Sequence, residues 1–355
     1  MKQREAERQS FSPWEQNTDP RRILIIRFHA LGDVAVTLPA SRGLRRCFPE
    51  SEIDFLTLEP HAPFLRSLDL FDRVLTMPAG MDRVERLSHA VRTGAAARMR
   101  RYDAIIDLQR NWVSRTIRLM AHPTAWGEFN RFAPRTASDR VLETIHRTGF
   151  DRVAPSFSFI LPLSLRENAR DLLHSGGCNP EEQFIVLNPA GLWKTRHWPI
   201  QSYASLARIW LEREPIRFVI LGTDRIRESA VSLESEIGPS VINLVGKTNV
   251  ETAIAILQQS ACVISEDSGL MHLAWAAGAP VVALFGSSKH VWSSPTGPLV
   301  RVLHSGDLSC GQCMQPECRF GDVHCLTRYT PESVLHAAKL LMPTPAFGNG
   351  KPWNA

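Results

Sequence analysis

The chain has 355 residues, of which 44% are hydrophobic and 22% are charged, which excludes a disordered or fibrous protein and suggests two domains of ordinary size. Its 41 lysine and arginine residues exceed its 36 acidic residues, giving a net charge of +5. This mildly basic balance suits an anionic partner, such as a phosphorylated ligand or a bilayer surface, but it does not require nucleic acid.

The N-terminal residues 1–20 are polar, carry Pro13 and Pro20, and show no periodicity, so we expect a flexible arm. No apolar stretch follows the initial charges, which argues against a signal peptide. The longest apolar run, 270–286, is interrupted by a histidine and a proline and is shorter than the roughly 20 residues of a membrane-spanning helix. We therefore expect a cytoplasmic protein whose contact with a membrane would be peripheral.

Two series of alternating strands and helices follow, separated by a proline-bearing segment at 151–163. The first has predicted strands at 23–28, 53–58, 73–77 and 104–108, and helices at 33–46 and about 82–101. The second has predicted strands at 184–190, 217–222, 241–246, 262–266 and 281–286, and helices at 202–213, 225–237, 250–259 and 331–341. Continuous apolar strands alternating with helices predict an α/β protein with two doubly wound, mostly parallel sheets.

This pattern divides the chain into an N-terminal domain over 21–160, a C-terminal domain over 161–342 and a tail over 343–355. Ligands of such folds bind at the carboxyl ends of the strands, which here means the cleft between the domains. Neither G-x-G-x-x-G nor G-x-x-x-x-G-K occurs, so a nicotinamide dehydrogenase or a P-loop nucleotidase is not expected.

The segment 27–40, RFHALGDVAVTLPA, joins the first strand to the first helix. Gly32 permits a tight turn, and Asp33 lies where the helix begins. One interpretation is that Asp33 caps the helix, which would stabilise it by about 1 kcal/mol. The other is that its carboxylate points into the cleft as a general base. The position alone favours the cap.

The segment 188–199, NPAGLWKTRHWP, carries Lys194, Arg196 and His197 in a loop between a strand and a helix. These cations could neutralise a diphosphate, although a solvated basic loop is the alternative. The flanking Trp193 and Trp198 favour a ligand site, because a solvated loop would leave two indoles without a purpose.

The segment 264–286, ISEDSGLMHLAWAAGAPVVALFG, places Asp267, Ser268 and Gly269 between a buried strand and a strongly apolar helix. The free amides of a helix N-terminus form an anion site, and Asp267 could cap this helix. His272 would face the cleft one turn into the helix, although a single histidine on an apolar helix is commonly a core residue.

Together these segments resemble glycosyltransferase family 9, the ADP-heptose:lipopolysaccharide heptosyltransferases. The resemblance rests on ALGDVAVTLP, RHWP and DSGLMHLAWAAGAP, of which the last is the most specific, and it extends from about Arg22 to Leu341. The cysteine stretch CGQCMQPECRFGDVHC also looks like one seen in many members. Membership implies the GT-B fold, in which two Rossmann-like domains face each other, the N-terminal one for the acceptor and the C-terminal one for the nucleotide sugar.

The resemblance also implies roles for individual residues. Asp33 matches the catalytic base of the family. The donor-binding residues that it implies are Lys194, Arg196, Asp224, Asp267, Ser268, Gly269 and His272. Arg196 matches a family lysine that contacts phosphate, a departure because a guanidinium is a planar fork rather than a point charge. Asp224 falls where the family places an acidic residue on the donor's ribose, and His29 stands where serine or threonine is usual.

The implied reaction is inverting transfer of heptose from ADP-heptose to the inner core of lipopolysaccharide, an anionic glycolipid, at the cytoplasmic face of the inner membrane. Asp33 would take the proton of the attacking acceptor hydroxyl, and the cations and the helix N-terminus would stabilise the departing ADP, so catalysis would require no metal or cofactor. Transfer of another sugar, a protein acceptor, or a non-catalytic GT-B-like protein that binds metal or nucleotide remain alternatives. The intact Asp33 and DSG motif argue against the last.

The segment 108–135 is rich in arginine. If the acceptor is an anionic, phosphorylated lipid core, the N-terminal domain should offer a basic patch for it, and Arg110, Arg115 and Arg131 are the candidates. Evenly spread surface arginines are the alternative interpretation.

Four of the seven cysteines, Cys310, Cys313, Cys318 and Cys325, fall in a loop at 309–326 with the spacing C-x2-C-x4-C-x6-C. In a cytosolic chain such a cluster indicates metal or redox chemistry before structural disulfides. Structural zinc or iron would suit four thiolates, and a loop of reduced thiols or an opportunistic disulfide is the alternative. We expect this loop to follow the last core strand and to brace the C-terminal domain without touching the reacting sugar.

Overall fold

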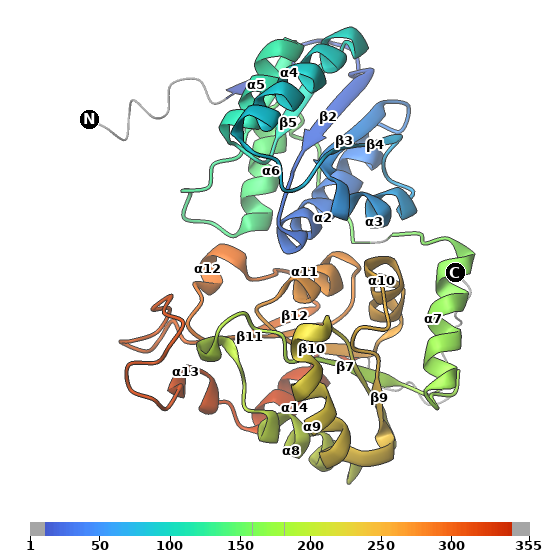
Figure 1. The fold of residues 1–355 in the computed structure, drawn as a ribbon, viewed down its shortest axis with the longest axis vertical. Helices are drawn as coiled ribbons and strands as arrows, with labels where there is room; N and C mark the ends of the chain where they lie inside the picture. Colours follow the sequence, from blue (N-terminus) through green and yellow to red (C-terminus); the bar gives the residue numbers. More distant parts are fainter. Residues whose placement is uncertain (1–10, 158, 181, 343–355) are drawn as a thin grey trace.

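The computed structural model describes residues 11–157, 159–180 and 182–342. Two six-stranded sheets, each covered by helices, lie one above the other in Figure 1. Each sheet is built of strands from one half of the chain, and all pairings but one are parallel. The predicted α/β class with two doubly wound sheets is therefore confirmed.

The N-terminal sheet has the strand order β1-β6-β5-β2-β3-β4. Its strands are β1 (Phe11–Ser12), β2 (Arg22–Ile26), β3 (Glu52–Leu58), β4 (Arg73–Met77), β5 (Ala104–Asp107) and β6 (Ala125–Glu128). Its helices are α2 (Leu31–Cys47), α3 (Ala62–Ser67), α4 (Arg83–Arg100), α5 (Trp112–Ala121) and α6 (Ala137–Arg147). The central strands β2 and β5 are buried over almost their whole length, as continuous apolar runs predict.

The predicted flexible arm needs correction where the structure describes it. Phe11 and Ser12 pair antiparallel with Gly127 and Trp126, and the Trp14 amide donates to the Thr148 carbonyl at 2.8 Å. This segment therefore forms an edge strand, because its backbone completes the ladder that β6 would otherwise leave open. Residues 1–10 and the predicted tail 343–355 lie outside the described residues.

The C-terminal sheet has the strand order β12-β11-β10-β7-β8-β9 and is parallel throughout. Its strands are β7 (Phe184–Asn188), β8 (Arg217–Ile220), β9 (Val241–Asn243), β10 (Cys262–Glu266), β11 (Val281–Phe285) and β12 (Val300–His304). Its longer helices are α7 (Leu163–Ser175), α8 (Ile200–Leu211), α9 (Arg227–Ile237), α10 (Val250–Gln259), α11 (Gly269–Ala276) and α14 (Pro331–Lys339), and α12 (His290–Ser293) and α13 (His324–Thr327) are single turns. The cysteine-rich loop thus follows β12, an edge strand that the sequence analysis missed because only its first residue is fully buried.

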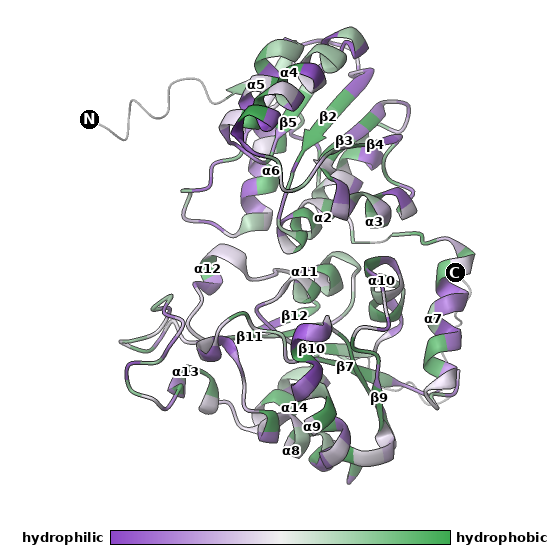
Figure 2. Ribbon diagram, in the orientation of Figure 1, coloured by the Kyte–Doolittle hydropathy of each residue, from purple (hydrophilic) through white to green (hydrophobic). Residues whose placement is uncertain are grey.

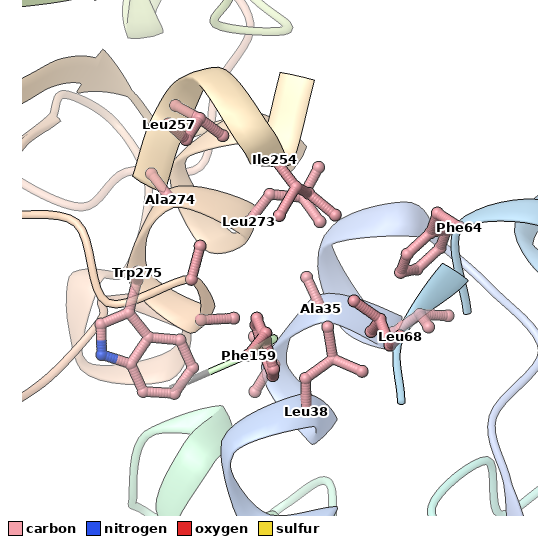
Figure 3. Packing of buried hydrophobic residues seen from close by; sticks show 14 of the residues in the cluster. Ala35, Leu38, Phe64, Leu68, Phe159, Ile254, Leu257, Leu273, Ala274 and Trp275 are labelled. Carbon is pink, nitrogen blue, oxygen red and sulfur yellow. The ribbon is translucent and has the colours of Figure 1, made fainter. Parts of the chain in front are cut away.

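The two domains share a hydrophobic core where α2 meets α11. Figure 3 shows Ala35 and Leu38 of α2 in one apolar cluster with Leu273, Ala274 and Trp275 of α11. Gly32 allows this approach, because a Cβ atom there would lie 2.8 Å from the His272 ring and 3.3 Å from the Gly269 Cα. The N-termini of both helices are therefore held beside each other, at the carboxyl ends of both sheets. Within the described residues, no helix has the length and apolar character to cross a membrane.

Candidate active site

A cavity of about 490 Å³ lies between the domains, where strands of both sheets end. Its N-terminal wall consists of Arg27, His29, Asp33, Val36, Gln109, Phe129, Arg131, Ala137, Arg140 and Val141. Its C-terminal wall consists of Arg196, Asp267, Ser288, Lys289, Trp292, Ser293 and Met314. The carboxyl ends of β2, β5 and β6 supply one wall and those of β10 and β11 the other, which agrees with the cleft expected for this fold.

Asp33 lies in the first turn of α2, with its carboxylate on the cavity. Its Oδ2 accepts the Ala30 amide at 3.1 Å and lies 2.8 Å from the Arg27 guanidinium. The N-cap is Ala30 rather than Asp33, so the predicted cap is wrong in position, although the carboxylate does satisfy a free amide of this helix end. About half of the side chain, 48%, stays exposed, which leaves the carboxylate open to a substrate hydroxyl.

Arg196 and Asp267 form an ion pair on the opposite wall. Nη1 of Arg196 lies 3.0 Å from Asp267 Oδ2, and its guanidinium stacks on the Trp193 ring, 4.1 Å from the centroid. The Arg196 Nε is buried and has no hydrogen-bond partner within the described part of the chain. A buried N–H without a partner is unfavourable, so this atom is suited to an anionic ligand that enters the cavity.

The second tryptophan of this loop has a different role from the one that its position suggested. Trp198 is only 1% exposed, its ring packs edge-on against Tyr203, and its Nε1 donates to the Tyr329 carbonyl at 2.9 Å. It is a core residue, and of the two indoles only Trp193 contacts the loop's cations.

Glu266, which was not among the predicted site residues, anchors the loop 188–199 by hydrogen bonds. Its Oε2 accepts the Gly191 amide at 2.7 Å and His197 Nδ1 at 2.9 Å, and its Oε1 accepts the Trp198 amide at 2.7 Å. Burial raises the pKa of Glu266, and the hydrogen bond from His197 opposes that rise. The sequence signal that could have revealed this role is a glutamate at the end of a buried strand, because a buried charged side chain needs hydrogen-bond partners.

The N-terminus of α11 is fixed by a second buried polar group. Ser268 is the N-cap and accepts the Met271 amide at 3.2 Å, so the predicted cap at Asp267 is wrong by one residue. Asn188 Oδ1 accepts from Ser268 Oγ at 2.7 Å and from Ser265 Oγ at 2.9 Å. Asp267 is thereby left on the cavity wall beside Arg196.

Comparisons with known proteins show which family the chain belongs to. The family model "Glycosyltransferase family 9 (heptosyltransferase)" matches residues 90–324. The chain belongs to glycosyltransferase family 9. It is 27% identical to lipopolysaccharide heptosyltransferase 2 of Salmonella typhimurium over 306 residues, which cover 79% of this chain and 87% of that protein.

Solved structures of the family share the fold. The family 9 glycosyltransferase of Veillonella parvula has a TM-score of 0.76 and 21% identity, over 90% of this chain and 97% of that chain. The ADP-heptose lipopolysaccharide heptosyltransferase II of Escherichia coli has a TM-score of 0.69 and 19% identity, over 90% of this chain and 98% of that chain. The fold is therefore GT-B, as the resemblance implied.

Not every donor residue implied by the family motifs reaches the cavity of this glycosyltransferase. Gly269 faces Gly32, and His272 is 8% exposed beneath the cavity wall. Burial lowers the pKa of His272, so its imidazole is neutral at neutral pH, and its Nδ1 has no partner among the described residues. Lys194 is exposed and Asp224 pairs with Arg227 at the surface, both outside the residues that line the cavity.

Of the three predicted acceptor arginines, one lines the cavity and two do not. Arg131 lines the cavity and donates to the Arg110 carbonyl at 3.0 Å. Arg115 makes a bidentate pair with Glu128 at 2.8 and 2.9 Å, and Arg110 donates to the Phe129 carbonyl at 3.2 Å. Burial alone would raise the pKa of Glu128, but the arginines around it lower that pKa. Arg110 and Arg115 therefore serve the domain's own carboxylate, and neither lines the cavity.

Three cations that were not among the predicted site residues also line the cavity: Arg27, Arg140 and Lys289. Arg140 donates to the Arg131 carbonyl at 2.6 Å and, across the domain boundary, to the Trp292 carbonyl at 3.0 Å. Arg27 and Arg140 both approach the Phe129 ring, at 5.4 and 5.2 Å from its centroid. Lys289 lies 4.3 Å over the Trp292 ring. Arg27 falls within the predicted strand 23–28, whereas β2 ends at Ile26, so in the structure Arg27 follows the strand and reaches the cavity.

The cysteine-rich loop reaches the cavity wall, and the expectation that it does not touch the reacting sugar stays a prediction. Met314 lines the cavity and its amide donates to the Ser287 carbonyl at 2.9 Å. The next carbonyl, of Gln315, accepts from Thr195 Oγ1 at 2.6 Å, beside Arg196. The loop therefore supports the C-terminal wall of the cavity, because it is hydrogen-bonded to the segments that carry Thr195 and Ser287.

The four thiols of this loop line a second cavity of about 620 Å³. None of the four forms a disulfide. Burial, and to a lesser extent the neighbouring thiols, raises the pKa of Cys325 to about 11. Their chemistry suits zinc or iron, but in the described residues no three histidine, cysteine or acidic side chains converge closely enough to hold an ion. The predicted metal stays a prediction.

Proposed function

We propose that this chain transfers heptose from ADP-heptose to the inner core of lipopolysaccharide, with inversion at the anomeric carbon and without a metal at the reacting centre. The proposal rests on one observation above all: the exposed Asp33 carboxylate and the Arg196–Asp267 pair face one cavity from opposite domains. The names of the relatives, a lipopolysaccharide heptosyltransferase and an ADP-heptose lipopolysaccharide heptosyltransferase, supply the donor and acceptor.

The N-terminal wall supplies the base. The acceptor hydroxyl attacks the anomeric carbon, and Asp33 accepts its proton, a contribution of about 10²–10⁴ in rate. Arg27 lies 2.8 Å from the carboxylate and holds it in place before the transfer. Attack from this wall on a donor held by the other wall places nucleophile and leaving group on opposite faces of the sugar, which gives inversion in one displacement.

The C-terminal wall supplies the stabilisation of the leaving group. ADP gains negative charge as the glycosidic bond breaks, and the guanidinium of Arg196 and the N-terminus of α11 are fixed before the reaction begins. Hydrogen-bond donors that are already in place stabilise the transition state most, because they need no reorganisation during the reaction. The proposed reaction therefore requires no metal.

The same wall-to-wall arrangement suits an anionic acceptor. Arg131 and Arg140 from one domain and Lys289 from the other line the cavity. Charged groups of this kind form strong hydrogen bonds with phosphate oxygens, so a phosphorylated core saccharide would be held between them.

The test is transfer by the purified chain with ADP-heptose and a lipopolysaccharide core that lacks its heptose. We expect ADP release that depends on the acceptor, persists in a chelator, and yields a product with inverted anomeric configuration. Equal turnover with other nucleotide sugars would reject the donor, retention of configuration would reject the mechanism, and loss of activity in chelator would reject metal independence.

A further inference from the structure

The outward side of helices α4 and α5 carries a row of exposed apolar side chains, which we call the α4–α5 face. The two helices lie side by side at the end of the N-terminal domain remote from the C-terminal domain (Figure 1). Met99 is 84% exposed, Val84 76% and Leu119 70%. The full set of large exposed apolar residues on these helices is Val84, Leu87, Val91, Met99, Trp112 and Leu119. Green and purple segments alternate along both helices in Figure 2.

The α4 helix is apolar over a wider sector than the part that packs on the domain. Ala90, Gly94 and Ala97 are buried against the domain, and a Cβ at Gly94 would lie 2.7 Å from Met120 of α5. At helical spacing the exposed residues at 84, 87, 91 and 99 form a stripe directly beside this buried side, so the apolar surface continues past the contact with the domain. This stripe has no partner within the described residues, so its apolar surface is available to something outside the chain.

Four arginines lie on the same helix: Arg83, Arg86, Arg92 and Arg98. At helical spacing Arg98 falls within the stripe and Arg92 directly beside it. All four are exposed, and none forms an ion pair in the part of the chain that the structure describes. The acidic residues of this helix, by contrast, are occupied: Glu85 accepts the Asp82 amide, and the Asp82 carboxylate accepts the Val84 and Glu85 amides. Both carboxylates lie at the start of the helix, whereas Arg92 and Arg98 lie further along it, so the later turns combine exposed apolar side chains with positive charge.

A shallow hollow of about 670 Å³ lies at the carboxyl ends of the two helices. Arg98, Arg101, Asp103 and His122 are among its lining residues, together with the exposed Met99, and the Asp103 carboxylate accepts the amides of residues 21 and 22. The hollow combines two arginines with an apolar side chain, a combination that suits a phosphate attached to an acyl-bearing headgroup.

We infer that the α4–α5 face docks on the surface of an anionic lipid bilayer, with the apolar stripe at the headgroup–acyl boundary and the arginines on lipid phosphates. A basic amphipathic helix with a hydrophobic side behaves in this way, and each cation near an anionic surface strengthens binding. A second copy of the chain fits worse, because a two-fold symmetric contact would bring these arginines against one another. The choice of partner rests on the proposed function, whose acceptor is a glycolipid, and the face belongs to the domain that carries the base.

The test is co-sedimentation of the full chain with vesicles of phosphatidylcholine alone or mixed with phosphatidylglycerol. We expect binding only to the anionic vesicles, weakened by salt. The double variant Arg92→Glu/Arg98→Glu should bind at least about tenfold more weakly, since one cation is worth about fivefold. Met99→Ser/Leu119→Ser should weaken binding severalfold. The charge-matched control Arg213→Glu/Arg301→Glu, at exposed sites in the other domain, should bind like the unchanged chain.

Two results would overturn the inference. The first is vesicle binding that neither α4–α5 variant weakens more than the control does. The second is a dimer in solution, detected by light scattering, that the same variants dissociate, which would make the face an interface between copies. All the changed side chains are exposed, so melting temperatures should stay equal and exclude misfolding. Transfer to a lipid-free core oligosaccharide, measured in parallel, separates the two proposals: it should survive in both variants, and its absence in the unchanged chain would reject the proposed function while leaving vesicle binding intact.

Discussion

Each domain has a buried carboxylate at the end of a central strand, and the oxygens of the two carboxylates are hydrogen-bonded very differently. Glu266, at the end of β10, has hydrogen-bond donors on both oxygens and holds the donor loop in place. Asp107, at the end of β5, accepts the Gln109 and Arg110 amides on Oδ1, at 3.1 and 2.9 Å, while its buried Oδ2 has no partner among the described residues. Burial raises the pKa of both groups, to about 6 for Asp107.

This difference distinguishes the two walls of the cavity: the C-terminal wall is preorganised by hydrogen bonds, and the N-terminal wall is rich in charged side chains. In the C-terminal half, Glu266 accepts the Gly191 and Trp198 amides, and Asn188 accepts the Ser268 hydroxyl. The loop 188–199 and the N-terminus of α11 are therefore fixed before a ligand arrives, as stabilisation of a leaving group requires. On the acceptor side, arginines surround a half-exposed carboxylate, an arrangement suited to proton transfer and to anions of varied shape. Changes in the acceptor half should therefore affect turnover, and changes in the donor half should affect nucleotide affinity.

The largest effect should follow Asp33→Asn. The amide can still accept the Ala30 amide proton but cannot take a proton from the acceptor, so we expect turnover to fall at least ~100-fold with ADP affinity little changed. Asp139→Asn is the matched control, since Asp139 occupies the same position in the first turn of α6 and lies outside the cavity lining. Retention of most activity in Asp33→Asn would show that Asp33 only stabilises its helix.

Arg196→Ala tests the donor half. Loss of a charge-assisted bond, worth about 1.5–3 kcal/mol, should weaken ADP binding by about tenfold to a hundredfold in calorimetry. Lys194→Ala is the comparison within the same loop, and its exposed position outside the cavity predicts a much smaller change. Equal ADP affinity in the unchanged chain and both variants would remove the loop from the phosphate site.

Much of this site could be predicted because it lies at the ends of strands that the sequence shows clearly. Asp33, Arg196 and Asp267 each follow a continuous apolar run, and parallel strands bring their carboxyl ends together. Arg140 and Lys289 could not be found in this way. Arg140 lies on a helix that follows β6, a four-residue strand containing glycine, and Lys289 lies in a loop whose distance from α6 only the tertiary fold determines.

The unsatisfied oxygen of Asp107 predicts a pH dependence of stability. Because burial raises the folded-state pKa of Asp107 to about 6, above the usual value for an aspartate, the folded chain binds the proton more tightly. This group's contribution to stability is therefore present at low pH and is lost as pH rises from about 4 to about 6. Asp107→Asn keeps the acceptor on Oδ1 and removes the titration. Its free energy of unfolding relative to the unchanged chain should therefore rise over this range, by on the order of 2–3 kcal/mol. Urea titrations at several pH values measure this difference, and parallel curves for the two chains would contradict it.

Glu266→Gln provides the opposite case and sharpens the comparison. Its two oxygens accept three N–H groups, so an amide group there would turn an N–H toward another N–H. We expect a loss of about 1–3 kcal/mol in stability at neutral pH together with weaker ADP binding. Asp107→Asn should leave ADP binding unchanged, since its partners lie in the acceptor half. Equal ADP affinity in both variants would mean that Glu266 is structural and does not position the donor loop.

The smallest effect should come from the cysteine-rich loop, and it depends on the metal. If Cys310, Cys313, Cys318 and Cys325 bind zinc or iron, protein purified without chelator should carry close to one equivalent of metal. The reason is that the free energy of binding at a structural site contributes to folding, so the metal is held tightly. Removal of the metal should then lower the melting temperature. It should also weaken ADP binding by a few-fold only, since the loop reaches the donor wall through the Gln315 carbonyl and the Met314 amide rather than through a thiol. Less than about a tenth of an equivalent of the two metals together would reject a structural site. Full occupancy with unchanged ADP affinity after removal would confine the loop to bracing its own domain.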